Sequence, residues 1–409
     1  MAAIPQSSSR VDSIDLLRGI VMIIMMLDHT RDFVHNATFQ FDPTDPTHTN
    51  VALFFTRWIT HFCAPVFIFL AGTSAYLQLA RGKSKRSLSW FLLTRGFWLI
   101  VLEVTVVRFG MTFSFSPAFA GFLQVIWVIG VSMIILAGLI HLPRVVIAAF
   151  GFIMIAGHNL LDGYRVGSWR GPQSPVPGLS SRVWIFLHQG FEAFPILWFF
   201  PSPILVVVYP LVPWVGVMAV GFVFGYLYQL DAMRRRKLLF IIGSVATVLF
   251  VVLRVINRYG DPGPWAQQKS PVYTLLSFLN TMKYPPSLLY LLMTLGPALI
   301  ALAMFERRSG AKRGRVANFF ILFGRVPLFF YVLQWPTARL ISLLLHFIAG
   351  KPVFWLFSSP VEFSPVPGLG FNLVIVYASW IAGVALLYPL CKWFAGVKQR
   401  RKDWWLSYL

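Results

Sequence analysis

The chain alternates long apolar stretches with short polar connections, a pattern typical of a protein that crosses a membrane many times. A helix of about 20 predominantly apolar residues spans a bilayer. Stretches near this length occur at residues 14–35, 51–80, 88–110, 122–141, 143–162, 203–229, 238–256, 286–305, 319–348 and 371–394. The pattern therefore predicts an all-α, polytopic membrane bundle with about ten transmembrane helices.

Basic residues distinguish the two ends of this predicted bundle. Clusters of lysine and arginine follow the second, sixth, eighth and tenth stretches, and they include Arg81, Arg234, Arg307, Lys312 and Lys398. Cytoplasmic loops carry an excess of these residues, so we expect the clusters, and with them both termini, on the cytoplasmic side. The loop at residues 36–50, on the opposite side, contains neither lysine nor arginine.

The chain divides into three segments on this interpretation. Residues 1–12 form a cytoplasmic N-terminal tail, residues 13–395 the transmembrane domain, and residues 396–409 a basic cytoplasmic C-terminal tail. No separate soluble domain is expected. The aromatic stretch 183–200 is predicted to be an interfacial or re-entrant helix, because tryptophan favours the membrane–water boundary.

The composition supports the membrane interpretation and argues against nucleic acid as a partner. Of the 409 residues, 57% are apolar and 12% are charged, and the mean hydropathy is +0.70. The net charge of +21 is spread over short runs between apolar stretches, whereas a nucleic-acid-binding protein presents a basic face on a soluble domain. Cys63 and Cys391 lie in separate apolar stretches, which excludes a disulfide framework. No cleavable signal peptide is predicted, so the first apolar stretch is expected to remain as a membrane helix.

Arg18 and His29 lie eleven residues apart in the first apolar stretch, and this spacing carries most of the functional information. Eleven residues of α-helix return to within about 20° of the starting face and advance by about 16 Å. One helix would then present an arginine near one membrane surface and a histidine near the other. Ionisable groups at such depth are usually functional. Two alternatives stay open: Arg18 reaches the headgroups or pairs with Asp15, and His29 belongs to a polar helix end.

Carboxylates near His29 would support a role as a base. Asp32 lies three residues further on, where side chains on a helix meet. A carboxylate that holds one imidazole nitrogen leaves the other free to take a proton. Asp28 points about 100° away and can pair with Arg31, as Asp32 can with Asn36. The guanidinium of Arg18 suits the recognition of phosphate.

Glu103 is one of the few acidic residues inside an apolar stretch, and it needs a cation. Arg57 or Arg325 on another helix is a better partner than Arg95 or Arg108 on its own helix, because neither of these lies at the favoured spacing. Glu103 then serves either as half of a structural ion pair or as part of the lining of a coenzyme path.

Several histidines remain to be assigned. His61 lies one turn after Arg57 and is predicted to face the same cavity. His158 and Asp162 share one helix face near the outer end of the fifth stretch, where they form a second acid–base pair, contact an acceptor, or simply end a helix. The other histidines considered are interpreted as loop or interface residues: His35, His48, His141 and His346. No metal site is expected, because no other cluster has the spacing of one.

The first apolar stretch resembles that of the transmembrane acyltransferases, whose signature is a basic residue, ten arbitrary residues and a histidine. It reads Arg10-Val-Asp-Ser-Ile-Asp-Leu-Leu-Arg-Gly-Ile20 and then Leu27-Asp-His-Thr-Arg-Asp32. More closely, the chain is similar to bacterial membrane proteins related to heparan-α-glucosaminide N-acetyltransferase. This likeness runs over nearly the whole chain and includes Phe62-Cys-Ala-Pro-Val-Phe-Ile-Phe-Leu-Ala-Gly72, Gly157-His-Asn-Leu-Leu-Asp162, Lys283-Tyr-Pro-Pro-Ser287 and Phe323-Gly-Arg-Val-Pro327.

The resemblance implies an enzyme of the bacterial inner membrane that transfers an acyl group, in the first instance acetyl, from cytoplasmic acyl-CoA to an outside acceptor. Acetyl-CoA would be a co-substrate and not a permanently bound cofactor. Its phosphates would lie near Arg18, Arg95, Arg57 and Arg325, at the mouth of a water-filled, cation-lined funnel. His29 would deprotonate an acceptor amine or hydroxyl, or form a covalent acyl-histidine first.

The acceptor is predicted to be a sugar or glycan, because the outer loops carry tryptophans whose rings suit sugar faces: Trp169, Trp265 and Trp355. The candidate acceptor contacts are His158, Asp162, His61, Glu103 and Gln334.

The chain departs from the family pattern at Gln334, in Tyr331-Val-Leu-Gln-Trp-Pro336, where a histidine is expected. Glutamine donates a hydrogen bond but shuttles no proton, which leaves the acceptor and the activity itself open. The alternatives are a proton-coupled transporter, with His29 and Glu103 in a relay together with Arg18 and Asp28, and an inactive scaffold. The oligomeric state, a homodimer included, also stays open.

Overall fold

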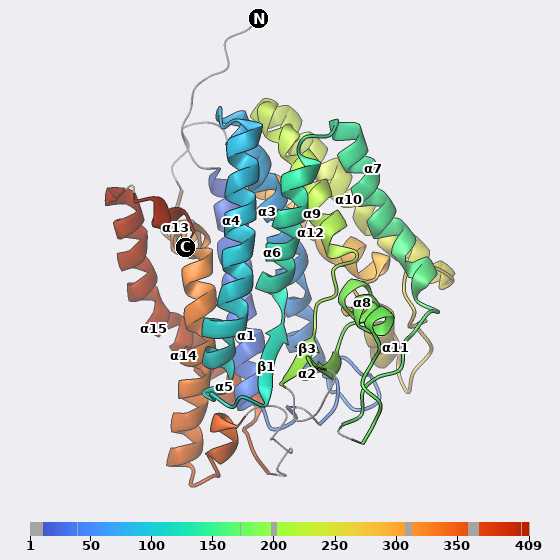
Figure 1. Ribbon diagram of the computed structural model, residues 1–409, viewed down its shortest axis with the longest axis vertical. Helices are drawn as coiled ribbons and strands as arrows, with labels where there is room; N and C mark the ends of the chain where they lie inside the picture. Colours follow the sequence, from blue (N-terminus) through green and yellow to red (C-terminus); the bar gives the residue numbers. More distant parts are fainter. Residues whose placement is uncertain are drawn as a thin grey trace, which may run out of the picture.

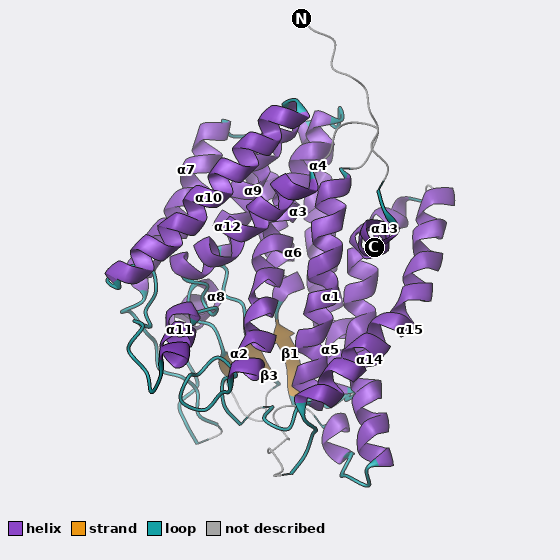
Figure 2. Ribbon diagram, turned by 180° about the vertical axis from the view of Figure 1, so that it is seen from behind, coloured by secondary structure: helices purple, strands orange, loops and turns teal. Residues whose placement is uncertain are grey.

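The computed structural model describes residues 11–38, 40–171, 173–197, 203–306, 313–358, 368–401 and 403–408. Most of these residues belong to helices that run along the long axis of the molecule and form one bundle (Figures 1 and 2). The helices are α1 (Asp12–Val34), α2 (Val51–Trp58), α3 (Cys63–Ala80), α4 (Lys85–Leu102), α5 (Arg108–Thr112), α6 (Val125–Leu139), α7 (Arg144–Gly157), α8 (Leu179–Leu187), α9 (Trp214–Phe224), α10 (Ala232–Ile256), α11 (Pro271–Leu279), α12 (Leu288–Phe305), α13 (Arg315–Arg325), α14 (Pro327–Ile348) and α15 (Leu373–Arg400).

The structure confirms a polytopic helical membrane protein. Within the described ranges, seven helical segments are long and apolar enough to cross a membrane: Val51–Ala80, Lys85–Thr112, Arg144–Leu161, Ala232–Ile256, Leu288–Phe305, Pro327–Ile348 and Leu373–Arg400. The predicted number of about ten is reached only by adding three more helices. Two of these are short apolar helices, Val125–Leu139 and Trp214–Gln229, and the third is the charge-bearing α1.

Helix α1 lies at the centre of the bundle and packs against α3, α12, α13, α14 and α15. Its 23 residues span about 34 Å, long enough to cross the hydrocarbon core. Most of its side chains are buried, including those of Asp15, Asp28 and Arg31. A membrane helix tolerates such residues when they face the protein interior and pair with one another. The charges that distinguish α1 are therefore kept away from lipid.

The predicted span 319–348 is divided into two helices at Val326. Pro327 stands at the first position of α14, where proline starts a helix without losing a hydrogen bond. Helix α13 crosses α1 closely at two glycines. A Cβ atom on Gly19 would lie 1.8 Å from the Phe320 carbonyl oxygen, and one on Gly324 would lie 1.8 Å from that of Asp15. Any larger side chain would push the two helices apart.

A small sheet shows that the all-α prediction is incomplete. Strands β1 (Phe119–Leu123), β2 (Glu192–Pro195) and β3 (Ile204–Val207) pair in the order β1-β3-β2, with β3 parallel to β1 and antiparallel to β2. The predicted span 203–229 therefore begins as a strand, and α9 starts only after two prolines. The β-branched run in β3 favours an extended strand, and pairing satisfies its backbone groups. The predicted helix over 183–200 is likewise limited to α8, which ends at Leu187; β2 follows, and residues 198–200 lie outside the described ranges.

The two ends of the bundle differ in character. The beginnings of α1, α4, α7 and α10 lie at one end, whereas the sheet, α2, α8 and α11 lie toward the other (Figure 1). The distribution of basic residues predicts that the first of these ends faces the cytoplasm. Of the basic residues named above, Arg307 and Lys312 lie outside the described residues.

Candidate functional site

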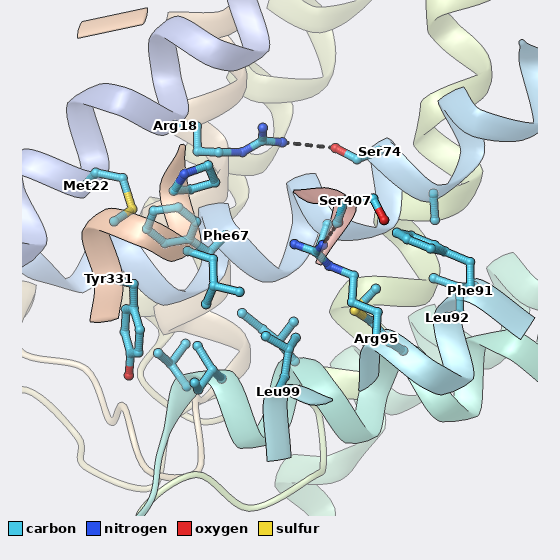
Figure 3. Close-up of a pocket in the computed structure, with 18 of the residues that line it drawn as sticks. Arg18, Met22, Phe67, Ser74, Phe91, Leu92, Arg95, Leu99, Tyr331 and Ser407 are labelled. Atoms are coloured by element: carbon cyan, nitrogen blue, oxygen red, sulfur yellow. Dashed lines mark hydrogen bonds between the residues drawn. The ribbon is translucent and has the colours of Figure 1, made fainter. Parts of the chain in front are cut away.

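A cavity of about 290 Å³ lies in the half of the bundle that contains the beginnings of α1 and α4. Helices α1, α3, α4, α6 and α14 line it together with the C-terminal segment (Figure 3). Most of the lining is apolar and includes Met22, Met25, Phe67, Leu99, Ile126, Met133 and Leu328. Two of the four predicted arginines, Arg18 and Arg95, line the cavity, and they are the only charged residues among the described lining residues.

Arg18 faces this cavity and not the membrane surface. Its Nη2 donates a hydrogen bond to Oγ of Ser74 at 2.9 Å, and its Nη1 lies 3.3 Å from Oδ1 of Asp15 and 3.4 Å from the Gly324 carbonyl oxygen. The side chain is 17% exposed. The predicted pairing with Asp15 is thus present, but the guanidinium is held inside the bundle by three helices.

Arg95 on α4 completes the cationic part of the cavity and is covered by the C-terminal segment. Its Nη1 donates to the carbonyl oxygen of Ser407, which follows Trp404 in a short 3₁₀ turn. The neighbouring Thr94 hydroxyl lies 2.6 Å from the hydroxyl of Tyr408. Figure 3 shows Arg95 beside Ser407, with Tyr331 at the end of the cavity remote from Phe91.

His29 lies beyond the other end of this cavity. Its ring packs on Trp335 of α14, with 3.6 Å between the ring centroids. Its Nδ1 is buried without a hydrogen-bond partner among the described residues, and Oδ2 of Asp32 is 4.0 Å away. The predicted pairing is therefore a long contact at 4.0 Å, and Asp32 accepts no hydrogen bond from His29. Asp32 instead accepts one from Nη2 of Arg31 at 2.5 Å.

Asp28 pairs with two arginines beside His29, Arg31 and Arg57. Its Oδ1 lies 3.0 Å from Nη2 of Arg31, as predicted, and its Oδ2 accepts a hydrogen bond from Arg57 on α2. Arg57 therefore lies at the His29 end of α1 and does not line the cavity. This ion pair fixes the beginning of the second span against α1.

Arg325 and Glu103 also differ from their predicted pairing. Arg325 does not line the cavity, and its Nη2 lies 3.6 Å from Oδ1 of Asp12. Glu103 forms no ion pair within the part of the chain that the structure describes, so the expected cation is missing. Its Oε2 accepts a hydrogen bond from the Trp127 backbone N–H at 3.0 Å. Glu103 also begins a π-helical segment, Glu103–Val107, a feature often found at functional sites.

Gln334 contacts Met25, the lining residue of α1 that is nearest to His29 in the sequence. It is buried on α14, and its Nε2 donates to Sδ of Met25 at 3.3 Å. Met25 lines the cavity, and His29 lies one helical turn, about 6 Å, further along α1. The cavity thus ends one turn short of the histidine, at a contact between a carboxamide and a weakly accepting thioether.

His61 and Lys283 lie near His29 on the outer side. The Tyr290 hydroxyl donates to the His61 carbonyl oxygen at 2.7 Å, and Nδ1 of His61 is buried without a described partner. Lys283, in the connection before α12, is buried and interacts electrostatically with Asp28 and His29. Sequence reasoning missed Lys283 and Trp335, because no local spacing relates either residue to the first helix.

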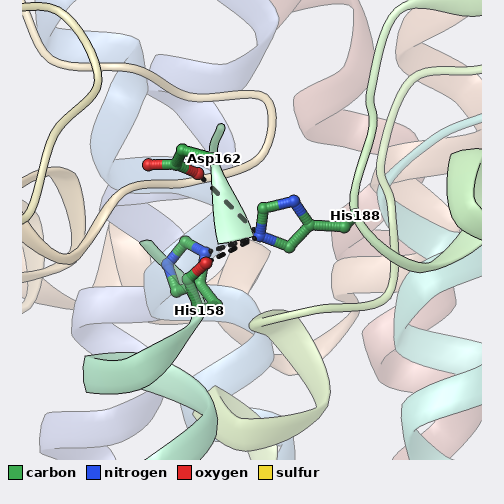
Figure 4. A group of neighbouring side chains, drawn as sticks. All are labelled: His158, Asp162 and His188. Carbon is green, nitrogen blue, oxygen red and sulfur yellow. Dashed lines mark hydrogen bonds and ion pairs between the residues drawn. The ribbon is translucent and has the colours of Figure 1, made fainter. Parts of the chain in front are cut away.

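His158 and Asp162 belong to a different cluster. Nε2 of His188 lies 3.2 Å from Nδ1 of His158 and 3.9 Å from Oδ1 of Asp162 (Figure 4). Burial lowers the pKa of the His188 imidazole, against the opposing effect of Asp162. Neither His158 nor Asp162 contacts His29 or lines the cavity in the described structure. His188 was missed as a partner, since thirty residues separate it from His158.

The outer tryptophans give little support to a sugar platform. Trp355 is buried, and Trp265 donates to the Arg254 carbonyl oxygen and packs on Phe278. Both side chains serve internal packing.

A comparison with known protein families finds one family model that matches the N-terminal part of the chain. The family model described as "Heparan-alpha-glucosaminide N-acetyltransferase, catalytic" matches residues 10–253, more than half of the 409 residues. The match confirms the resemblance that the first helix indicates, and it includes Arg18, His29, Arg95 and Glu103. Gln334 and Trp335 lie beyond it. No curated protein matches the chain.

Proposed function

The chain belongs to the heparan-α-glucosaminide N-acetyltransferase catalytic family, and from this premise we propose how its cavity and His29 divide the work of acetyl transfer. Membership makes the protein an acetyl-CoA-dependent acetyltransferase of a membrane. The proposal is that acetyl-CoA enters from the cytoplasmic end and that a glucosamine-containing acceptor receives the acetyl group at the outer face. The bacterial inner membrane is the proposed location.

The donor is proposed to bind with its phosphates at Arg18 and Arg95. Guanidinium groups present several hydrogen-bond donors in a fixed plane that matches phosphate oxygens. The apolar lining between these arginines and Tyr331 suits the pantetheine arm, which carries no charge. This arrangement directs the thioester toward Met25 and Gln334.

His29 is proposed to act as the general base, and this rests on one observation: a buried imidazole nitrogen without a hydrogen-bond partner at the outer end of the helix that also lines the donor cavity. His29 accepts a proton from the acceptor amine as its nitrogen attacks the thioester carbonyl carbon. The C–N bond forms, the C–S bond breaks, and the proton passes to the departing coenzyme A sulfur. Packing on Trp335 keeps the ring in position.

Gln334 is proposed to help at the point where the cavity ends. Its carboxamide N–H donates to the thioether of Met25. When the thioester binds, the same N–H can donate instead to the thioester oxygen, which becomes negatively charged during attack. A donor directed at such an oxygen stabilises the transition state. The glutamine therefore supports transfer by hydrogen bonding, without carrying a proton.

The decisive experiment measures acetyl-CoA binding to the purified protein in detergent by calorimetry. We compare the wild type with Arg18→Lys and Arg95→Ala, and with Arg234→Ala as the matched control, because Arg234 is an exposed arginine at the same end of the bundle. Saturable binding that weakens at least tenfold in both cavity variants, but not in the control, supports the donor site. Equal affinity in all four proteins contradicts it.

A further inference from the structure

Outside the donor cavity, two histidines and an aspartate converge where α7 ends. His158 and Asp162 come from the end of this helix, and His188 comes from the turn after α8. Their nearest nitrogen and oxygen atoms all lie within 4.8 Å of one another. We propose that this cluster binds a divalent transition-metal ion of the zinc class and thereby fastens the segment carrying α8 to the end of α7.

The geometry of the three ligand atoms supports a metal. Zn²⁺ binds imidazole nitrogen and carboxylate oxygen at about 2.0–2.2 Å in tetrahedral sites, which places neighbouring ligand atoms about 3.3 Å apart. Nδ1 of His158 and Nε2 of His188 are 3.2 Å apart, and Oδ1 of Asp162 is 3.9 Å from the latter. Figure 4 shows the Asp162 carboxylate and the His158 ring both directed toward Nε2 of His188.

The chemistry of the ligand set points in the same direction. Two imidazoles and one carboxylate are a ligand set that zinc uses in proteins. His158 is 3% exposed and His188 is 4% exposed, so water cannot readily satisfy the two facing nitrogens. Without a metal, Nε2 of His188 can instead donate to the His158 carbonyl oxygen, which lies 3.1 Å away, so metal binding requires the ring proton of His188 to move to Nδ1. A bound ion replaces that proton and engages both lone pairs.

Residues around the cluster hold the ligands in place. Nδ2 of Asn159 donates to Oδ2 of Asp162 at 2.7 Å, which leaves Oδ1 directed at His188. Oδ1 of the same asparagine accepts a hydrogen bond from the Leu288 backbone N–H at 2.9 Å. Such outer contacts orient ligands at metal sites. The cluster is thus tied to the beginning of α12 as well as to α7.

The cluster also has an entry path and a structural consequence. The Asp162 side chain is 15% exposed, so an ion can enter from the outer solvent and keep a water ligand there. The ion would close the segment between Asp162 and His188, which includes α8, and would reduce the entropy that this segment gains on local opening. The site is separate from His29 and does not depend on the proposed acetyl transfer.

The test measures metal binding to purified protein that has first been treated with a chelator and then dialysed. Zn²⁺ is titrated by calorimetry, bound zinc is counted by mass spectrometry, and Co²⁺ is followed by its visible absorption. We expect one ion per chain, a tetrahedral Co²⁺ spectrum, and a higher Tm with Zn²⁺. His188→Ala should lose all three properties, and Asp162→Asn should weaken affinity at least tenfold.

His48→Ala is the matched control, because His48 also pairs with a carboxylate in an outer loop, Asp45 at 2.9 Å, but at the surface. It should bind zinc as the wild type does. His188→Gln serves as a second variant if the alanine variant does not elute as a folded protein. Failure of the wild type to bind, or equal binding by the His188 variants, would overturn the site and leave a His–His–Asp hydrogen-bond network.

Discussion

At the scale of single residues, His29 combines two properties that rarely occur together in a membrane helix. Its ring is held on one face by Trp335, yet its Nδ1 has no partner among the described residues. The nearby carboxylates of Asp28 and Asp32 are occupied by Arg31 and Arg57. Both carboxylates are therefore engaged by arginines, and neither forms a hydrogen bond with Nδ1 of His29.

Replacing His29 tests its role directly. His29→Ala should lower the acetyl-transfer rate by about 10²–10⁴-fold, the usual contribution of a general base, because the acceptor amine then loses no proton as it attacks. Acetyl-CoA binding should change less than twofold, since His29 does not line the cavity. Both quantities are measured on the same preparation, with His141→Ala as an exposed control.

Retained turnover in His29→Ala would remove His29 from the mechanism. Mass spectrometry of wild-type protein incubated with acetyl-CoA alone separates the two chemical routes. An acetyl group attached to His29 would indicate the acyl-histidine route, and unmodified protein with full activity would indicate direct transfer.

At the scale of elements, the C-terminal segment and the α1–α13 crossing each bring a backbone carbonyl to one arginine of the cavity. Gly19 and Gly324 bring α13 against α1, so that the Gly324 carbonyl reaches Arg18. The turn Trp404–Ser407 covers Arg95 at the mouth. One contact is built into the crossing of two helices, whereas the other depends on a short segment at the end of the chain.

Removing one hydrogen bond of this segment should favour donor entry. Tyr408→Phe deletes the contact with Thr94, worth about 0.5–1.5 kcal/mol, and so makes it easier for Arg95 to exchange the Ser407 carbonyl for a phosphate. Acetyl-CoA affinity should rise by about two- to tenfold, measured by calorimetry. Tyr164→Phe, the same change at an exposed tyrosine outside this segment, should leave it unchanged. A fall in affinity would instead make the segment part of the donor site.

At the scale of the whole molecule, the cavity and His29 lie on successive parts of one helix that runs through the bundle. Arg18 is near the beginning of α1, toward the end that the basic residues assign to the cytoplasm, and His29 is near its end, toward the sheet (Figure 1). This order predicts that donor and acceptor approach from opposite sides of the membrane.

Sidedness can be measured in proteoliposomes of known orientation. Acetyl-CoA, which does not cross lipid, is supplied on the side of the basic loops, and glucosamine is supplied as the probe acceptor on the other side. We expect N-acetylglucosamine only on the acceptor side, and none with His29→Ala. Product formed only when both substrates share a side would contradict the proposed path. Glucosamine that crosses unmodified would identify a transporter.

The sequence by itself determined what depends on local periodicity. The apolar stretches predicted the membrane bundle, and eleven residues of helix placed Arg18 and His29 on one stripe, because both lie on the same element and its geometry is regular. The Asp28–Arg31 pair followed for the same reason. The sequence did not predict the strands. The short β-branched run of β3 is as apolar as a membrane helix, and only its pairing with β1 identifies it as a strand.

Tertiary structure alone decided which distant side chains meet. Arg57 pairs with Asp28 and not Glu103, Trp335 packs on His29, and His188 joins His158, each across a separation that no local pattern encodes. The physical reason is that the energy of a buried polar group depends on the partner that packing brings within hydrogen-bond distance. Helix periodicity fixes the direction of a side chain, but the folding of all the helices together determines what that side chain contacts.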